Sequence, residues 1–500
     1  MLFSSYSFLF FFLPATLAGF GLLTRYQGAK AAKLWLVLAS LFFYGWWNPF
    51  CVVLILASMT FNFWMGRQLG QRARLSRQTG GALFFGVAVN LALLGWFKYA
   101  NFFVNSVNWA AGSHWHLDKV LLPLGISFFT FTQIAYLVDV RRGIVCEYDF
   151  GDFLLFVTFF PHLIAGPIIH HSEMMPQFAN ERTCRFEWNN LAVGLSLFSL
   201  GLFKKLVIAD WMAENAGKVF GAAASGKLLH MQEAWAGVLA YTFQIYFDFS
   251  GYSDMAVALG LMFGIVLPQN FNSPYKAVNL ADFWRRWHMT LSRFLRDYLY
   301  IPLGGNRRGE PRRYVNLIVT MVLGGLWHGA AWTFVLWGLF HGTGLAIQHG
   351  WQALWSKLCP ERPTWWPMRL ASWGGRVSTL LFVMVGWVLF RSADLRTARH
   401  LLAVMFGLGQ RPIAGTPLMM HANAWLWFGV LLAGVWCLPN TVELMGRHVM
   451  LPELEGEETP AARGWRQWEL STRWACLAGL LLAISILCVS RGGEFLYYNF

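Results

Sequence analysis

Charged residues are scarce in this chain: Asp, Glu, Lys and Arg make up 13% of its 500 residues, about half the share of an ordinary globular protein. A chain of this length folded into several soluble domains would need more charge to cover their surfaces. Instead, 56% of the residues are hydrophobic and 17% are aromatic. This composition excludes disordered, collagen-like and soluble-enzyme classes, and it indicates a protein that crosses a membrane several times.

Cysteine is present but follows no pattern. The chain has no C-x-x-C pair and no repeated spacing between cysteines, which argues against a zinc ribbon, a redox pair and a disulfide framework. We therefore expect no metal site, and we expect the cysteines in apolar stretches to pack as small hydrophobic side chains. The seven residues are Cys51, Cys146, Cys184, Cys359, Cys437, Cys476 and Cys488.

The chain also lacks an internal repeat, a low-complexity linker and a positive residue ahead of its first apolar run. That run covers residues 6–23, and the first Lys or Arg is Arg25. Because a signal peptide needs a positively charged n-region, we expect the run to be a retained membrane helix. Without repeats or linkers, residues 1–500 are expected to form a single membrane-embedded domain.

Long apolar runs are what the sequence does contain, and a helix needs roughly 20 apolar residues to cross a bilayer. Two runs, 233–266 and 314–350, are too long for one straight crossing, so each is either a tilted helix or a crossing followed by a broken, re-entrant piece. We predict an all-α polytopic membrane protein with about eleven transmembrane helices plus re-entrant and amphipathic helices. The candidate spans are 5–24, 31–48, 50–67, 80–104, 119–140, 151–170, 190–210, 233–266, 314–350, 368–391, 422–440 and 472–490.

Positive residues in the connections between these runs set the expected orientation. Arg and Lys gather in the connections 25–33, 67–77 and 141–142, and they are nearly absent from the intervening ones. This alternation places those three connections in the cytoplasm and the N-terminus outside. The most basic stretch, 276–313, holds nine Lys or Arg against three acids, so it is also expected on the cytoplasmic face.

Residues 279–300, inside this basic stretch, are predicted to form one amphipathic helix. Phe283, Trp287 and Phe294 recur near helical spacing among the arginines. A basic, aromatic-rich helix is typical of a helix that lies on a membrane surface. It could also line a site for an anionic substrate, and the two interpretations are compatible.

Polar residues inside apolar runs are costly, so each is a functional hypothesis. His328 lies in the segment Gly324–Gly329 of the run 314–350. Glycines on both sides permit close approach by a ligand, and an imidazole that titrates near pH ~6.5 suits proton transfer. The alternative is a buried histidine hydrogen-bonded to a carbonyl. His341, 13 residues further on, is expected to be structural.

A second polar group ends in His288, after Asp282, Arg285, Arg286 and Trp287. The adjacent arginines could hold the imidazole neutral, as a general base requires, or could bind phosphate groups. The alternative is an amphipathic helix whose long side chains extend to the membrane surface.

A third polar group is formed by Asp248 and Asp254, two carboxylates six residues apart in an apolar setting. Paired carboxylates can bind ions or serve as acid and base. They could equally bond Ser, Tyr or Arg partners and stabilise the fold.

A fourth group is His162 in the segment Phe160–Pro167, where two prolines bracket a break in a helix. Such breaks occur in membranes where protein or a cavity satisfies the backbone. A structural and a functional role for His162 both remain open.

Together these segments resemble the membrane-bound O-acyltransferase family, and within it the bacterial branch of alginate O-acetyltransferases and the D-alanyl transfer protein of teichoic acid synthesis. The resemblance covers nearly the whole chain, and the matching segments follow in order. They are Met1–Ser5, Leu122–Phe128, Phe160–Ile168, Tyr246–Asp254, Asn270–Tyr275, Asp282–Leu291, Tyr300–Arg307, Trp327–Gly329 and Phe495–Phe500.

The resemblance implies a bacterial inner-membrane enzyme whose helices form a ring around a thinned centre. The family's invariant histidine matches His328, and its second commonly required polar position matches His288. It also implies acetyl-CoA as a cytoplasmic donor, no tightly bound cofactor, and a periplasmic acetyltransferase or acetyl-carrier protein as partner. That partner would modify an exopolysaccharide such as alginate or cellulose. Membrane lipids are expected around the protein, and no nucleic acid is expected to bind.

The chemistry that such a reaction needs agrees with these residues. A thioester is already activated, so the enzyme must supply a base, charge stabilisation and exclusion of water. We expect His328 to be the base, with His288, Trp287 or backbone N–H groups of Gly324–Gly329 stabilising charge. Because no Cys or Ser lies in a nucleophile motif such as G-x-S-x-G, direct transfer is simpler than an acyl-enzyme. The residues expected to bind substrate are Trp287, Arg285, Arg286, Trp327, Asp282, Asp248 and Asp254.

Two rival functions use the same features. A transporter or flippase of an acyl carrier or lipid-linked intermediate would also have intramembrane His and Asp residues and broken helices. Transporters commonly contain internal repeats, and this sequence shows none. A scaffold that recruits a soluble acetyltransferase would not need polar residues at membrane depth.

Overall fold

The computed structural model describes residues 1–75, 78–145, 149–180, 183–359, 368–409, 423–446, 467–491 and 493. Within these ranges the regular elements are helices, and no strand is found among them. The predicted all-α class is therefore confirmed. Cys146 and the C-terminal segment 495–500, which contributed to the family resemblance, lie outside the described residues.

The helices of the first half of the chain include three π-helical turns, η1 (Phe8–Phe12), η2 (Gly95–Tyr99) and η3 (Lys204–Ala209), each continuous with a neighbouring α-helix. The α-helices up to residue 262 are α1 (Leu13–Tyr26), α2 (Ala29–Gly45), α3 (Pro49–Arg74), α4 (Gly80–Leu94), α5 (Ala100–Ala111), α6 (Ile126–Arg141), α7 (Phe150–Thr158), α8 (Phe160–Leu163), α9 (His171–Ala179), α10 (Trp188–Phe203), α11 (Asp210–Ala224) and α12 (Met231–Met262).

The second half of the chain contains shorter elements between long helices. They are the short turn η4 (Pro274–Lys276), α13 (Leu280–Arg286), α14 (Met289–Leu295), the π-helical η5 (Arg296–Tyr300), α15 (Glu310–His328), α16 (Trp332–Leu358), α17 (Met368–Arg391), α18 (Leu395–Met405), α19 (Ala424–Cys437), α20 (Thr441–Met445), α21 (Thr472–Cys488) and η9 (Val489–Arg491).

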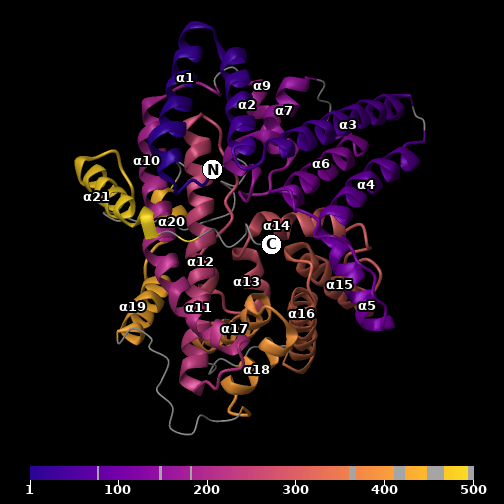
Figure 1. Ribbon diagram of the computed structural model, residues 1–500, viewed down its shortest axis with the longest axis vertical. Helices are drawn as coiled ribbons and strands as arrows, with labels where there is room; N and C mark the ends of the chain where they lie inside the picture. Colours follow the sequence, from indigo (N-terminus) through magenta and orange to yellow (C-terminus); the bar gives the residue numbers. More distant parts are fainter. Residues whose placement is uncertain are drawn as a thin grey trace.

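The long helices surround the short helices α13 and α14, which lie near the middle of the molecule (Figure 1). The N-terminal residues also reach this interior, because Met1 and Phe3 are buried and the Phe3 ring stacks on Tyr252 of α12 at 4.9 Å between centroids. The arrangement therefore places the short, basic segment between helices that come from both halves of the chain.

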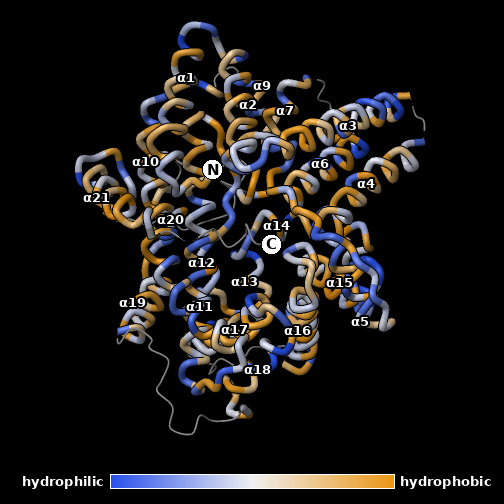
Figure 2. The backbone as a smooth tube through the Cα atoms, in the orientation of Figure 1, coloured by the Kyte–Doolittle hydropathy of each residue, from blue (hydrophilic) through white to orange (hydrophobic). Residues whose placement is uncertain are grey.

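Within the described residues, five helical segments are long and apolar enough to cross a membrane: Phe8–Tyr26, Pro49–Arg74, Gly80–Ala111, Trp188–Ala224 and Ala371–Arg391. Two shorter apolar helices, α19 and α21, accompany them. Figure 2 shows hydrophobic residues along outer helices such as α4 and α10. Large apolar side chains lie on the surface, for example Phe84 at 76% exposure, where lipid rather than water is the favourable solvent. The chain is a multi-pass membrane protein.

The two long apolar runs differ in structure, although their hydrophobicity is similar. The run 233–266 forms one unbroken helix, α12, in which all but four of the 32 residues are buried. The run 314–350 is broken after His328, and α15 and α16 pack tightly against each other. Glycines permit this approach, because a Cβ on Gly338 would lie 2.3 Å from the backbone oxygen of Met321.

The predicted single helix over 279–300 is wrong, because the backbone breaks at Trp287 and His288. His288 adopts a left-handed conformation with φ 43°, which ends α13 before α14 begins. Residues 270–272 stabilise the break with two backbone hydrogen bonds. Asn272 N donates to Arg286 O at 2.9 Å, and Met289 N donates to Asn270 O at 3.0 Å.

The end of α6 contacts the basic stretch 276–313. Arg142 donates to the backbone oxygen of Asp297 at 3.0 Å, and its guanidinium lies over the Tyr298 ring at 5.2 Å. The connection 141–142 and residues 297–298 of this stretch therefore lie side by side, as a shared cytoplasmic face requires.

Candidate active site

His328 is the last residue of α15 and is 4% exposed. Its ring is enclosed by aromatic side chains, with centroid distances of 4.8 Å to Trp327, 5.3 Å to Trp337 and 5.2 Å to Phe390. These contacts come from α15, α16 and α17, so three long helices fix the position of the imidazole. Aromatic packing of this kind leaves the ring little freedom to rotate.

His288 lies between α13 and α14 and is fully buried. Its Nδ1 is 2.9 Å from Asn270 Oδ1, which also accepts hydrogen bonds from Thr290 Oγ1 at 2.9 Å and from the backbone N–H of Thr290 at 3.4 Å. Because this amide oxygen accepts from a backbone donor, the orientation of the Asn270 amide is defined. His288 then carries its proton on Nδ1, and its Nε2 is an acceptor with no hydrogen-bond partner among the described residues.

The two histidines, 40 residues apart in the sequence, meet in the centre of the protein. Their ring centroids are 6.4 Å apart, with an angle of 53° between the ring planes. Trp327 completes the group, since its ring lies 6.2 Å from that of His288. The structure thus brings together three of the site residues that the sequence predicts.

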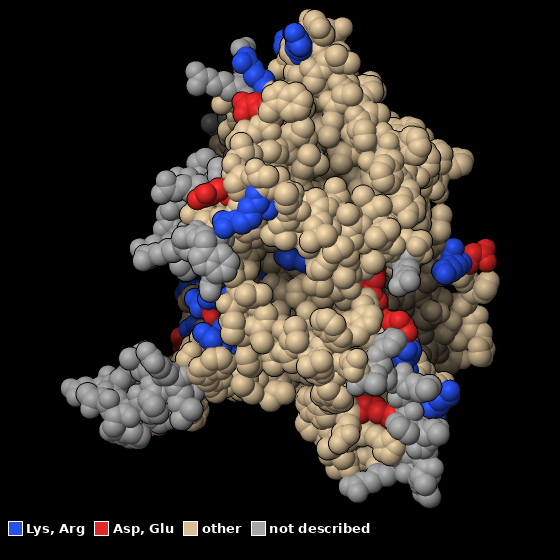
Figure 3. Space-filling model, turned by 90° about the vertical axis from the view of Figure 1, so that its left-hand side faces the viewer, with Lys and Arg blue, Asp and Glu red and all other residues tan. Residues whose placement is uncertain are grey.

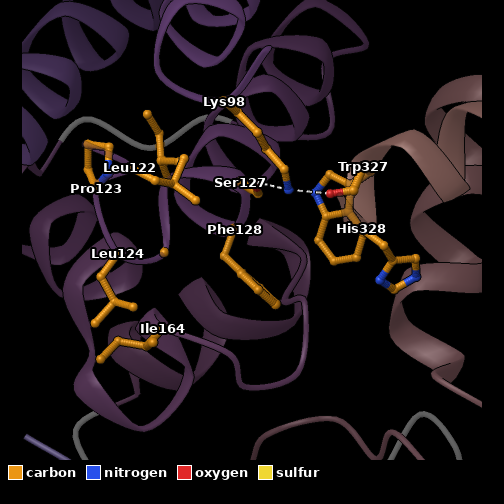
Figure 4. Close-up of a pocket in the computed structure, with 11 residues that line it drawn as sticks. Lys98, Leu122, Pro123, Leu124, Ser127, Phe128, Ile164, Trp327 and His328 are labelled. Carbon is orange, nitrogen blue, oxygen red and sulfur yellow. Dashed lines mark hydrogen bonds between the residues drawn. The ribbon is translucent and has the colours of Figure 1, made fainter. Parts of the chain in front are cut away.

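A cavity of about 80 Å³ opens beside His328, bounded by Lys98, the segment Leu122–Phe128, Ile164 and Trp327 (Figure 4). The Lys98 ammonium donates to Ser127 Oγ at 3.2 Å and to the backbone oxygen of Trp327. Lys98 therefore lines the same cavity as His328. Lys98 is not among the site residues predicted from the sequence, although a lysine within an apolar run is costly and is therefore a recognisable signal.

The indole of Trp327 separates Lys98 from the imidazole of His328 (Figure 4). It stacks on Phe131 at 5.2 Å between centroids, and its buried Nε1 has no hydrogen-bond acceptor among the described residues. This N–H is available to a ligand that carries negative charge. The backbone N–H groups of Gly324–Gly325, in contrast, lie inside α15, where helical hydrogen bonding occupies them.

Trp287 has a different environment from its neighbour His288. Its ring packs at 5.0 Å from both Phe271 and Trp387 and at 5.6 Å from Phe283. This aromatic cluster buries the indole and fixes the end of α13. The contacts favour a positioning role for Trp287 over direct contact with substrate.

The carboxylates of Asp248 and Asp254 are engaged by lysines of the adjoining helical segment. Lys205 Nζ lies 2.7 Å from Asp248 and 2.7 Å from Asp210, and Lys204 Nζ lies 2.6 Å from Asp254. These ion pairs connect α12 to η3 inside the protein. They favour the structural alternative, with lysine rather than Ser, Tyr or Arg as the main partner.

Asp282 and Arg286 also pair with each other, since Arg286 Nε donates to Asp282 Oδ1 at 3.0 Å. Asp282 Oδ2 accepts from the Val278 backbone N–H at 3.2 Å, which tightens the start of α13. The Arg285 side chain, in contrast, is 73% exposed and 3.8 Å from Asp282.

Arg285 lines a cavity of about 670 Å³, together with Arg293, Arg296 and His349. The cavity lies between the α13–α14 segment and the helices α15 and α16. Within the set of predicted substrate-binding residues, Arg285 is the one whose charge faces an open, basic space. Arg293 is partly neutralised there by an ion pair with Glu173 at 2.5 Å.

His162 is buried in α8, and a ring nitrogen lies 3.0 Å from the Phe156 backbone oxygen. This contact favours the structural alternative for the fourth polar group. His341 is buried as well, 4.9 Å from Trp337 between ring centroids, so one aromatic residue separates it from His328.

Comparison with known proteins adds to this geometry. A family model described as "MBOAT, membrane-bound O-acyltransferase family" matches residues 81–393. The chain is 44% identical over 434 residues to the peptidoglycan O-acetyltransferase of Helicobacter pylori, a match that covers 82% of this chain and 80% of the relative. It is 44% identical over 418 residues to the probable alginate O-acetylase AlgI of Azotobacter vinelandii, covering 82% and 79%.

A more distant match extends the comparison to another acyl group. The teichoic acid D-alanyltransferase of Bacillus subtilis is 29% identical over 280 residues, covering 53% of this chain and 68% of the relative. The region matched by the family model contains Lys98, His288 and His328.

Proposed function

The chain belongs to the membrane-bound O-acyltransferase family, and from this premise we propose that it transfers acetyl groups from cytoplasmic acetyl-CoA toward a polysaccharide outside the membrane. It is an acyltransferase of the multi-pass membrane class. The acetyl group follows from the relatives that are named as O-acetylases and O-acetyltransferases. We further propose the full family topology of about eleven crossings.

The observation that carries this proposal is the pairing of the buried His328 and His288 rings beside a cavity that Lys98 also lines. His328 borders that cavity, and the ring of His288, with its proton on Nδ1, lies 6.4 Å from the ring of His328 between centroids. A base and hydrogen-bond donors that stabilise the developing negative charge are groups that acyl transfer from a thioester can use.

In the proposed reaction His328 accepts the proton of an acceptor hydroxyl as its oxygen attacks the thioester carbonyl carbon. The C–S bond then breaks, and the thiolate of coenzyme A leaves and takes up the proton from the imidazole. Negative charge on the carbonyl oxygen would be stabilised by the Lys98 ammonium and the Trp327 indole N–H. The aromatic enclosure of His328 excludes water, which would otherwise hydrolyse the thioester.

The proposal also includes a protein partner and an acceptor polymer outside the membrane. A protein that works from within the membrane needs a component outside it to reach a polymer, and we propose a periplasmic acetyltransferase or acetyl carrier. An exopolysaccharide such as alginate or cellulose is the acceptor class we favour. The rival function, transport of an acyl carrier, would not consume acetyl-CoA.

The proposal is tested in the native host and in vesicles made from its membranes. Loss of the gene should remove base-labile acetate from one surface polysaccharide, as measured by ion chromatography after mild alkali, and complementation should restore it. Inverted vesicles, which expose the cytoplasmic face, should release free coenzyme A from added acetyl-CoA. Unchanged acetate in all polysaccharide fractions would refute the function, and thioester use by right-side-out vesicles alone would refute the donor side.

Substitution of Arg285 tests whether the cavity of about 670 Å³ binds the anionic nucleotide of coenzyme A. Replacing Arg285 by Gln should raise the KM for acetyl-CoA about tenfold, the effect of one hydrogen bond to a charged group, with kcat nearly unchanged. Arg396→Gln, an exposed substitution outside the cavity, is the matched control and should leave KM unaltered. A fall in kcat at constant KM would instead assign Arg285 to the transition state or to folding.

A further inference from the structure

A second large groove lies at the end of the molecule that carries the α1–α2 turn. Its volume is about 1290 Å³, and its walls come from α1, α2, the end of α9 and the start of α10. None of its lining residues borders the His328 cavity or the basic cavity beside Arg285. The groove is therefore a separate feature that the proposed acetyl transfer does not use.

One wall of this groove is apolar and continues into candidate membrane spans. Leu17 and Leu22 of α1 face it, as do Phe178 of α9 and Leu191 of α10. The spans Phe8–Tyr26 and Trp188–Ala224 respectively end and begin here. The groove is thus located where two membrane helices reach the boundary between hydrocarbon and water.

The rim of the groove is basic. It contains Arg25, Lys30, Lys33 and Arg185, and the one carboxylate among the described lining residues, Asp152, pairs with Lys33 at 2.8 Å. In the part of the chain that the structure describes, Arg25, Lys30 and Arg185 have no carboxylate within 4 Å. Figure 3 shows Lys and Arg side chains at the upper end of the molecule, where the α1–α2 turn lies.

Aromatic side chains complete the rim. Trp188 is 77% exposed at the first residue of α10, and the adjacent Phe186 ring packs edge-on against it at 5.0 Å. The Phe186 ring also packs beside Gly21 of α1. Exposed tryptophan at the end of an apolar helix is characteristic of the headgroup level of a bilayer.

We propose that this groove binds an anionic phospholipid of the surrounding membrane. The phosphate of the headgroup would be held by the basic rim, with Arg25 contributed by α1 and Arg185 by the segment before α10, and one acyl chain would lie along the apolar wall. Charge complementarity selects anionic over zwitterionic lipids, because the rim carries an excess of positive charge in a region of reduced dielectric. The division of the groove into a basic and an apolar part matches an amphiphile better than a free nucleotide.

The test uses the full-length protein in nanodiscs that contain phosphatidylglycerol and phosphatidylcholine in equal amounts. Native mass spectrometry should find phosphatidylglycerol retained on the wild-type protein. The triple variant Arg25→Gln/Lys30→Gln/Arg185→Gln should bind it on the order of 100-fold more weakly, since each cation near a membrane surface contributes about a fivefold factor. The matched control is Lys227→Gln/Arg396→Gln/Arg399→Gln, which removes three cations distant from the groove in sequence and should retain the lipid.

A charge-preserving variant and a competition experiment with acetyl-CoA complete the test. The charge-preserving variant Arg25→Lys/Arg185→Lys should retain phosphatidylglycerol, which separates loss of charge from loss of folding. Equal lipid retention by the two triple variants would overturn the proposal. Displacement of the lipid by acetyl-CoA would also overturn it, because the groove would then be a donor site. Acetyl-transfer activity does not enter this readout, so the proposed function and the lipid site fail independently.

Discussion

Replacing His328 by Gln is expected to lower the rate of acetyl transfer by about 10²- to 10⁴-fold, the usual contribution of a general base. Glutamine keeps hydrogen-bonding capacity and approximate size but has no titratable nitrogen. The protein should still insert in the membrane, because the aromatic enclosure of Trp327, Trp337 and Phe390 remains. The measurement is release of coenzyme A by purified protein at matched expression, with His328→Ala as the more severe variant.

His288 should respond differently if it orients or stabilises the reacting groups. His288→Gln is expected to leave measurable residual turnover. His341→Gln is the matched control, since His341 is also a buried histidine packed on Trp337, and it should keep near-normal turnover in the fraction that folds. Near-normal activity of His328→Gln combined with loss in His288→Gln would reverse the two roles and make His288 Nε2 the base.

The second large effect concerns stability. Lys205→Met should reduce the free energy of unfolding by about 3–5 kcal/mol, the cost of removing one partner from a buried ion pair. The Lys205 side chain is 4% exposed and lies 2.7 Å from both Asp210 and Asp248. Without the ammonium, two carboxylates would face each other inside the protein.

The matched control is Lys218→Met, which breaks the pair with Glu214 on the surface of α11, where Lys218 is 34% exposed. Such a pair contributes about 0–1 kcal/mol. Denaturant titration in mixed micelles measures both differences. Replacement of the whole cluster, Lys205→Met/Asp210→Leu/Asp248→Leu, should recover most of the loss. Equal losses for Lys205→Met and Lys218→Met would show that the buried cluster does not stabilise the fold.

The sequence alone was sufficient for the class of the protein and for its family. Scarce charge and abundant apolar residues require a membrane solvent, because such a composition cannot cover a soluble surface with polar atoms. His328 and His288 could also be identified from the sequence as candidate site residues, since an ionisable group in an apolar run is costly and therefore stands out. Family membership then follows from motifs that lie in order along the chain.

Only the tertiary structure decided whether a long apolar run forms one helix or two. The runs 233–266 and 314–350 are similarly apolar, yet one is a continuous buried helix and the other is a tight pair of helices. The difference depends on the close packing that Gly325 and Gly338 permit between α15 and α16. The hydrophobicity of a segment indicates that it lies in an apolar environment, but it does not indicate which helix the segment packs against.

Long-range contacts also determine how the residues of the candidate active site are arranged. The backbone break at His288 depends on hydrogen bonds to residues 270–272. The position of Lys98 depends on its contact with Trp327, which is 229 residues away in the sequence. The helical spacing of aromatic residues in 279–300 predicted one continuous helix. That prediction failed because local spacing contains no information about hydrogen bonds to residues 270–272. Composition thus determined the membrane environment and made the two histidines candidates, while the fold determined which groups surround them, because side-chain partners are fixed by long-range packing.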